Sequence, residues 1–321
     1  MQILAITIPI FIFVAVGFFS KEKGFIGGET RNFLNKFVYY ITFPALTFKS
    51  IVSFDFASTF RLNLVACNVT ATCCIFVLTF FIALLIKQRL RRGAFNMSCF
   101  RSNQGYMGLP IINGFYGEQA MSRAAVINGF DSPTVIILSV IALEIFKGKG
   151  RSNKEKTNLR NALNNGGERL FFFFSNPFIF SAFLGLIFSY YKVPVLKIDL
   201  LDKLLGMTGN MSLPLALILI GCSIEIKKFQ NNLKLVLTAS FVKLLVMPLT
   251  AFLIAYFLFH FRGADLGMSV IITAMPSAVS TYVMAAEMET DAELAATIIG
   301  FTTFVSVITI SIVQFLLVKI I

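Results

Sequence analysis

Polar and helix-breaking residues gather at two points of an otherwise apolar chain. Segment 101–114 contains three glycines, two asparagines and Pro110, and segment 273–282 places Pro276 among serines and threonines. Proline removes a backbone donor and clashes with the preceding helical turn, so a helix breaks or kinks there. Inside lipid such a break is tolerated only where protein or a cavity satisfies the freed groups. Two broken helices that cross would present positive half-helix N-termini to an anion.

The sequence therefore predicts an anion site where these two segments cross near the middle of a membrane. The alternative is close helix packing, because Gly, Ser and Thr also line ordinary helix contacts in bilayers. Lys243 is added because it is a cation in the middle of an apolar stretch, whereas Arg101 is expected at the cytoplasmic mouth with Arg91 and Arg92. The candidate substrate-binding residues are Asn103, Gln104, Gly105, Pro110, Asn113, Pro276, Ser277, Ser280, Thr281 and Lys243.

Asp131 is the best candidate for binding a coupling ion. A charge within an apolar stretch costs at least a few kcal/mol, so a retained carboxylate is a functional candidate. We predict that it exchanges a proton or helps to hold Na⁺, with Asn128 and Ser132 beside it. A helix-capping or solvated carboxylate is the alternative. The amide oxygens that could complete such an ion site are those of Asn103, Asn113 and Asn128.

The composition indicates that these residues belong to a chain surrounded mainly by lipid. The chain of 321 residues is 57% hydrophobic and 14% charged, whereas soluble domains are about 25% charged. A membrane helix needs about 20 apolar residues. Ten such stretches occur, at 3–20, 33–53, 63–86, 95–116, 120–146, 171–191, 200–224, 233–259, 265–287 and 292–318. The sequence thus predicts an all-α, multi-pass membrane protein with no room for a soluble catalytic domain.

The two halves of the chain resemble each other. Pro44 answers to Pro214 and Pro110 to Pro276, each pair separated by about 170 residues, as expected for a duplication. Five stretches per copy is an odd number, so the second copy must enter the membrane from the opposite side. We therefore expect ten transmembrane helices in two inverted five-helix repeats, with broken, crossing fourth and ninth helices. The repeats are residues 1–146 and 171–321, joined by a cytoplasmic linker at 147–170.

The distribution of positive charge predicts orientation. The net charge is +12, and most Lys and Arg residues lie after the odd-numbered stretches and in the linker. Positive loops stay in the cytoplasm, so both termini are expected outside the cell (inner) membrane. The basic residues are thereby assigned to orientation and lipid headgroups, and no nucleic-acid partner is expected.

Four proline-containing segments carry a further signal, at residues 34–46, 102–110, 211–216 and 274–279. Together they resemble the auxin efflux carrier family, which shares the broader bile-acid and arsenite transporter architecture. The resemblance implies scaffold and transport domains, crossed broken helices, and small organic anions as cargo. The short central loop resembles the bacterial branch. Assembly into a homodimer is one possibility that the sequence does not decide.

We interpret the chain as a secondary active transporter that moves a small organic anion, a mono- or dicarboxylate, by alternating access. Coupling to H⁺ or Na⁺ is expected, with no other cofactor. The sequence lacks a phosphate-binding Gly-Lys-Ser/Thr loop, so ATP is not expected to power transport directly. A channel or a sodium-coupled bile-acid-type symporter of the same architecture is the alternative. A receptor is a weaker one. An enzyme is not expected, since no nucleophile, base and orienting partner form a recognisable set.

Overall fold

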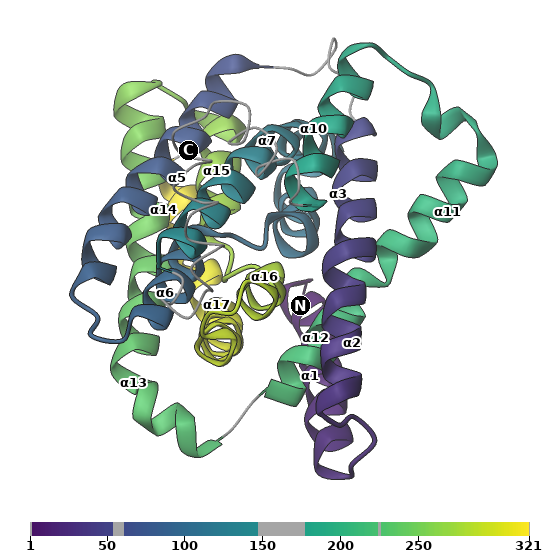
Figure 1. Cartoon of the computed structure of the whole chain (residues 1–321). Helices are drawn as coiled ribbons and strands as arrows, with labels where there is room; N and C mark the ends of the chain where they lie inside the picture. The colour runs from purple at the N-terminus through teal and green to yellow at the C-terminus, as the bar shows by residue number, and fades with distance from the viewer. Residues whose placement is uncertain (1, 54–60, 147–176, 224–225, 321) are drawn as a thin grey trace, which may run out of the picture.

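The computed structural model describes residues 2–53, 61–146, 177–223 and 226–320, which are helical apart from connecting turns and loops (Figure 1). Within these ranges the structure has no named strand, and its isolated β-bridge joins Ser102 to Ser277. The all-α prediction therefore holds for the described residues. The linker predicted at 147–170 lies outside them.

Helix covers part or all of each of the ten predicted apolar stretches. In the first half the helices are α1 (Gln2–Glu22), α2 (Gly28–Phe37), α3 (Phe43–Val52), α5 (Leu62–Leu84), α6 (Arg89–Phe100) and α7 (Leu109–Phe146). In the second half they are α10 (Pro177–Tyr190), α11 (Asp199–Asn210), α12 (Ser212–Ser223), α13 (Ile226–Phe241), α14 (Met247–Leu253), α15 (Gly263–Ala274), α16 (Ser280–Glu287) and α17 (Ala292–Ile320).

Five continuous helical runs among the described residues are long and apolar enough to cross a membrane. These are Leu62–Leu84, Gln119–Phe146, Asp199–Ser223, Asn232–Leu258 and Ala292–Ile320. α7 is in fact two helices that meet at a kink at Gly117, whose φ of 79° favours glycine. This kink separates the fourth predicted stretch from the fifth.

Prolines widen the helices locally. Wider π-helical turns end immediately before Phe43-Pro44, Leu109-Pro110 and Met247-Pro248. Proline cannot donate to the carbonyl four residues earlier, and its ring pushes that carbonyl away, so the chain relaxes into a wider turn. The relevant turns are η1 (Val38–Thr42), η2 (Gln104–Gly108) and η4 (Val242–Val246).

The helices pack as two groups. One, which we call the scaffold group, comprises α1, α2, α3, α10, α11 and α12, with α1 against α12 and α3 against α10 and α11. The other, the crossing group, comprises α5, α6, α7, α13, α14, α15, α16 and α17. Figure 1 shows α1, α2, α3 and α11 on one side and α5, α6, α13 and α14 on the other. α7, α16 and α17 contact both groups.

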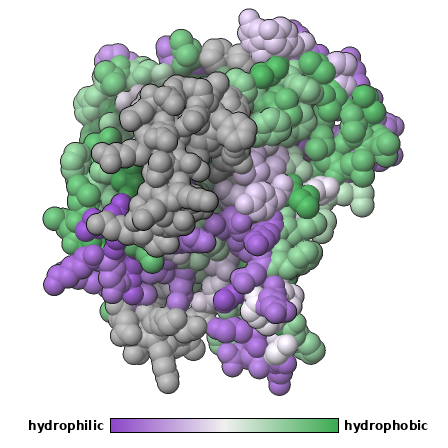
Figure 2. All heavy atoms as spheres, viewed as in Figure 1, coloured by the Kyte–Doolittle hydropathy of each residue, from purple (hydrophilic) through white to green (hydrophobic). Residues whose placement is uncertain are grey.

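Large apolar side chains cover much of the outside. Leu204, Met207 and Phe257 are each more than half exposed. Figure 2 shows broad hydrophobic areas on this face, including the region of α11. Such a surface is compatible with contact to lipid tails, because apolar side chains need no hydrogen-bond partners there.

Candidate functional site

Two interrupted helices meet inside the crossing group. α6 ends at Phe100 and helix resumes at Gln104, while α15 ends at Ala274 and α16 begins at Ser280. The extended residues between them run antiparallel. The N–H of Asn103 donates to the carbonyl of Pro276 (2.8 Å), and the N–H of Ala278 donates to that of Arg101 (3.1 Å). Each break thus supplies partners for the backbone groups that the other break frees.

Buried hydroxyl groups stabilise this crossing. Ser277 is fully buried, and its Oγ donates to the carbonyl of Ser98 at 2.6 Å. The backbone N–H of Ser277 donates to Oγ1 of Thr302 on α17 at 3.2 Å. The Thr302 hydroxyl therefore holds the unwound backbone in place.

Lys243 lies behind the crossing, outside the cavity described below. It is fully buried in η4, and its Nζ donates to the Ser102 hydroxyl and to the carbonyl of Thr273 at 3.0 Å. Thr273 is in the last turn of α15, where the helix dipole is negative and a cation is favourable. The predicted contact of Lys243 with substrate is not supported by this placement, because its ammonium group is occupied by the crossing.

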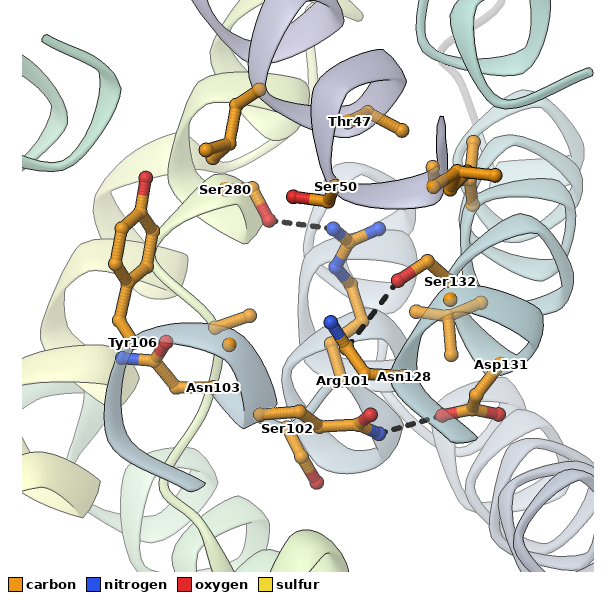
Figure 3. A pocket seen from close by; sticks show the side chains of 18 of the residues that line it. Thr47, Ser50, Arg101, Ser102, Asn103, Tyr106, Asn128, Asp131, Ser132 and Ser280 are labelled. Atoms are coloured by element: carbon orange, nitrogen blue, oxygen red, sulfur yellow. Dashed lines mark hydrogen bonds between the residues drawn. The ribbon is translucent and has the colours of Figure 1, made fainter. Parts of the chain in front are cut away.

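A cavity of about 380 Å³ lies beside the crossing (Figure 3). Its walls come from α3, the three residues before η2, η2 itself, α7, and Ala278 and Ser280 at the start of α16. Gln104 and Ser280, the first residues of the two resumed helices, both line it, so two positive helix ends face the same space. The polar lining residues are Thr47, Ser50, Ser53, Arg101, Ser102, Asn103, Gln104, Tyr106, Asn128, Asp131, Ser132 and Ser280.

Asp131 lines this cavity from α7 and is fully buried. Nε2 of Gln104 donates to its Oδ2 at 2.6 Å, and the Thr72 hydroxyl of α5 lies near the carboxylate, whereas Oδ1 accepts no hydrogen bond of ordinary geometry from the described residues. One helical turn earlier, Asn128 accepts a hydrogen bond from Ser132 through Oδ1 at 3.4 Å. The carboxylate therefore has one oxygen left to take up a proton or to contribute to a cation site.

Arg101 is the main correction to the sequence analysis. It is 5% exposed and points into the cavity, rather than lying at a cytoplasmic mouth with Arg91, which pairs with Asp291 at 3.2 Å. Nη1 donates to Ser139 Oγ (2.8 Å) and Nη2 to Ser280 Oγ (2.6 Å). The physical reason is that α6 ends at Phe100, so Arg101 has an extended backbone and belongs to the crossing rather than to the helix.

The structure brings together some of the other predicted residues and separates the rest. Asn103, Gln104, Gly105 and Ser280 line the cavity with the predicted ion-coupling residues. Pro276, Ser277 and Thr281 are part of the crossing but do not line the cavity. Pro110 and Asn113 are on an exposed part of α7 and do not line the cavity, so their contact with substrate stays a prediction. Both residues lie in the first helical turns after η2, which lead away from the cavity.

Sequence reasoning missed the wall formed by α3, including Thr47 and Ser50, and it missed Tyr106 of η2. No local signal marks the α3 residues, since small hydroxyl side chains are common in membrane helices. Arg101 did carry a signal. It is a cation placed directly before a polar helix break, where its side chain must leave the helix face.

Comparison with known proteins identifies the family. A family model described as "Membrane transport protein" matches residues 3–314. The chain belongs to this family, the auxin efflux carrier family. The chain is a multi-pass membrane transporter, and relatives described below are named as transporters.

Two relatives resemble it over nearly their whole length. An "Uncharacterized transporter" of Methanothermobacter thermautotrophicus is 25% identical over 94% of each chain. A "Putative malonate transporter" of Rhizobium meliloti is 23% identical over 97% of this chain and 94% of that protein. Among solved structures, the sodium proton antiporter MjNhaP1 of Methanocaldococcus jannaschii has a TM-score of 0.60 at 14% identity. The alignment covers 94% of this chain and 92% of the antiporter, a likeness of fold alone.

Proposed function

We propose that this protein is a secondary active transporter that moves a small organic anion, a mono- or dicarboxylate, across the cell membrane by alternating access. One observation carries the proposal: two interrupted helices are hydrogen-bonded to each other beside a cavity that is lined by both a buried guanidinium and a buried carboxylate. Such broken helices, with their ends aimed at a midplane site, are typical of secondary transporters.

An anion fits this cavity better than a cation or an apolar solute. The two helix N-termini and Arg101 all contribute positive potential to the same space. The relative named as a putative malonate transporter supports a small carboxylate as cargo.

Asp131 is the proposed coupling residue. Its Oδ1 could take up a proton. Alternatively, Oδ1 could ligate Na⁺ together with the oxygens of Asn128 and Ser132. The antiporter that shares the fold is named for both sodium and protons, so both ions are candidates. The pH and sodium arms of the assay below separate them.

Alternating access would follow from the proposed repeats, residues 1–146 and 171–321, as ten helices in two inverted sets. The packing offers support: α1 lies on α12, and α10 lies on α3. If the repeats are exchanged, α1 corresponds to α10 and α12 to α3, so one contact becomes the other. We place both termini outside the cell and the linker in the cytoplasm, in accord with the distribution of positive charge.

The test is uptake by proteoliposomes over a series of mono- and dicarboxylates, with pH and sodium gradients imposed separately. We expect saturable accumulation of at least one carboxylate, dependence on one gradient, and acceleration by substrate on the opposite side. Non-saturable flux without this acceleration would indicate a channel. Absence of uptake for every carboxylate, with the protein folded and correctly inserted, would refute the proposal.

A further inference from the structure

We propose that Arg101 binds a single carboxylate of the cargo, and that the cavity selects monoanions whose other end is a neutral hydrogen-bonding group. This inference rests on the proposed function and makes it more specific. A dicarboxylate would be accepted as its singly protonated form. Amides, hydroxy acids and keto acids of similar size would be accepted as ordinary monoanions.

The guanidinium of Arg101 is held in place but only partly used. Its hydrogen bonds go to neutral groups, the hydroxyls of Ser139 and Ser280 and the sulfur of Met284. Nε is buried and has no hydrogen-bond partner in the described part of the chain. None of the ion pairs found there includes Arg101. A buried charge with only neutral partners favours binding of an anion, and a guanidinium can bind a carboxylate with two parallel N–H donors.

The opposite charge in the cavity limits how much negative charge the cargo can bring. Arg101 is the one cation and Asp131 the one acid among the described lining residues. The other titratable groups that act on Asp131 are Lys243 and Cys73, neither of which lines the cavity. A second cargo carboxylate would face the carboxylate of Asp131 with no further cation in the described lining to bind it, since Lys243 is already hydrogen-bonded within the crossing. Like charges held a few ångströms apart disfavour ionisation of both.

The remaining polar wall is neutral. Asn103, Asn128 and Ser132 line it, and Figure 3 shows all three around the same space as Arg101. Amides and hydroxyls both donate and accept hydrogen bonds, so they suit an amide, a hydroxyl, a carbonyl or a protonated carboxyl. A cavity of about 380 Å³ accommodates a short acid of this kind together with water molecules.

Binding can be measured without transport, by the rise in melting temperature of the purified full chain in detergent when a ligand binds. The probes are malonate, its monoamide malonamate and its neutral diamide malonamide, which have similar size but carry different charge. We expect malonamate to stabilise the protein at alkaline pH, where malonate is a dianion and stabilises it less. Malonate should gain as the pH falls, and malonamide should have little effect.

Substitutions separate carboxylate binding from a merely structural role. Arg101→Gln should weaken malonamate binding by about tenfold or more and abolish the preference for malonamate over malonamide, while Arg101→Lys should restore part of it. Arg61→Gln is the matched control, because Arg61 pairs with Asp265 outside the cavity. A structural role would reduce stability without removing the preference between the acid and its amide.

Three results would overturn the inference: stronger binding of dianionic malonate than of malonamate, retention of the acid preference by Arg101→Gln, or no stabilisation of the wild-type protein by any of the acids. Failure of the proposed function is recognised differently, by the absence of carboxylate uptake in proteoliposomes. A wild-type protein that accumulates carboxylates while Arg101→Gln keeps its acid preference would refute only the role of Arg101.

Discussion

At the scale of single residues, the site depends on two buried charges that do not pair directly. Asp131 was identifiable from the sequence because a carboxylate is expensive in an apolar stretch, and it does line the cavity. Arg101 was assigned to the wrong place because the exact end of α6 decides where its side chain points. A helix one residue longer would have placed it on a different face.

Asp131→Asn should remove coupling while leaving the cavity intact. The amide has nearly the same shape but cannot take up a proton, and it offers a cation only one neutral oxygen. We expect accumulation driven by an ion gradient to be lost, while exchange of cargo across the membrane persists. Asp265→Asn is the control, since Asp265 pairs with Arg61 and Arg123 away from the cavity. Unchanged uptake with unchanged pH and sodium dependence would rule out the coupling role.

Thr302→Val should destabilise the crossing. The valine keeps the shape of the side chain but leaves the buried N–H of Ser277 without an acceptor. An unsatisfied buried donor costs about 1–3 kcal/mol, so the melting temperature in detergent should fall. Thr302→Ser keeps the hydroxyl and should remain close to wild type. Equal melting temperatures for the valine and serine variants would contradict this account.

At the scale of elements, prolines and glycines determine how the helices bend and how closely they approach. Three of the π-helical turns precede prolines, whose missing donor favours a wider turn. Gly17 of α1 packs against the backbone of Ile218 on α12, and Gly221 packs against that of Val14. These contacts give the scaffold group its closest helix pair.

Gly17→Ala and Gly300→Ala should change stability in opposite directions. A Cβ on Gly17 would overlap the carbonyl oxygen of Ile218, which is backbone and cannot rotate away. We expect a loss of about 1–3 kcal/mol, typical of an overpacked contact. A Cβ on Gly300 in α17 meets nothing within 4 Å, so the better helix former should add about 0.5–1 kcal/mol. Melting temperatures in detergent would test both, and a stable Gly17→Ala would show that α1 and α12 can separate at little cost.

At the scale of the whole molecule, two cavities lie between the helix groups at opposite ends of the stretch from α2 to α3. The cavity of the candidate site contacts α3, whereas a second cavity of about 610 Å³ contacts Arg31 and Lys36 of α2 and Glu287 of α16. Near the second cavity, Ser223 of α12 donates a hydrogen bond to the hydroxyl of Tyr282 on α16. This bond joins the scaffold group to the crossing group.

Ser223→Ala and Tyr282→Phe should alter transport to the same extent, and the double variant should match either one. Both changes remove the same hydrogen bond, so their effects should be non-additive by about 0.5–1.5 kcal/mol. If the helix groups separate during transport, the bond exists in only one state, and its loss should change the rate of exchange in proteoliposomes. Additive effects would show that the bond does not couple the groups.

The sequence by itself determined the solvent, the helical class and the two points where helices break. These properties are local. They follow from the lengths of the apolar stretches and from the backbone N–H donors that Pro110 and Pro276 lack. Only the tertiary structure decided that Lys243 faces the crossing, that Arg101 faces the cavity and that α3 closes its wall. Those outcomes depend on the residue at which each helix ends and on contacts between distant segments. The local sequence of one segment specifies neither the residue at which its helix ends nor its contacts with distant segments.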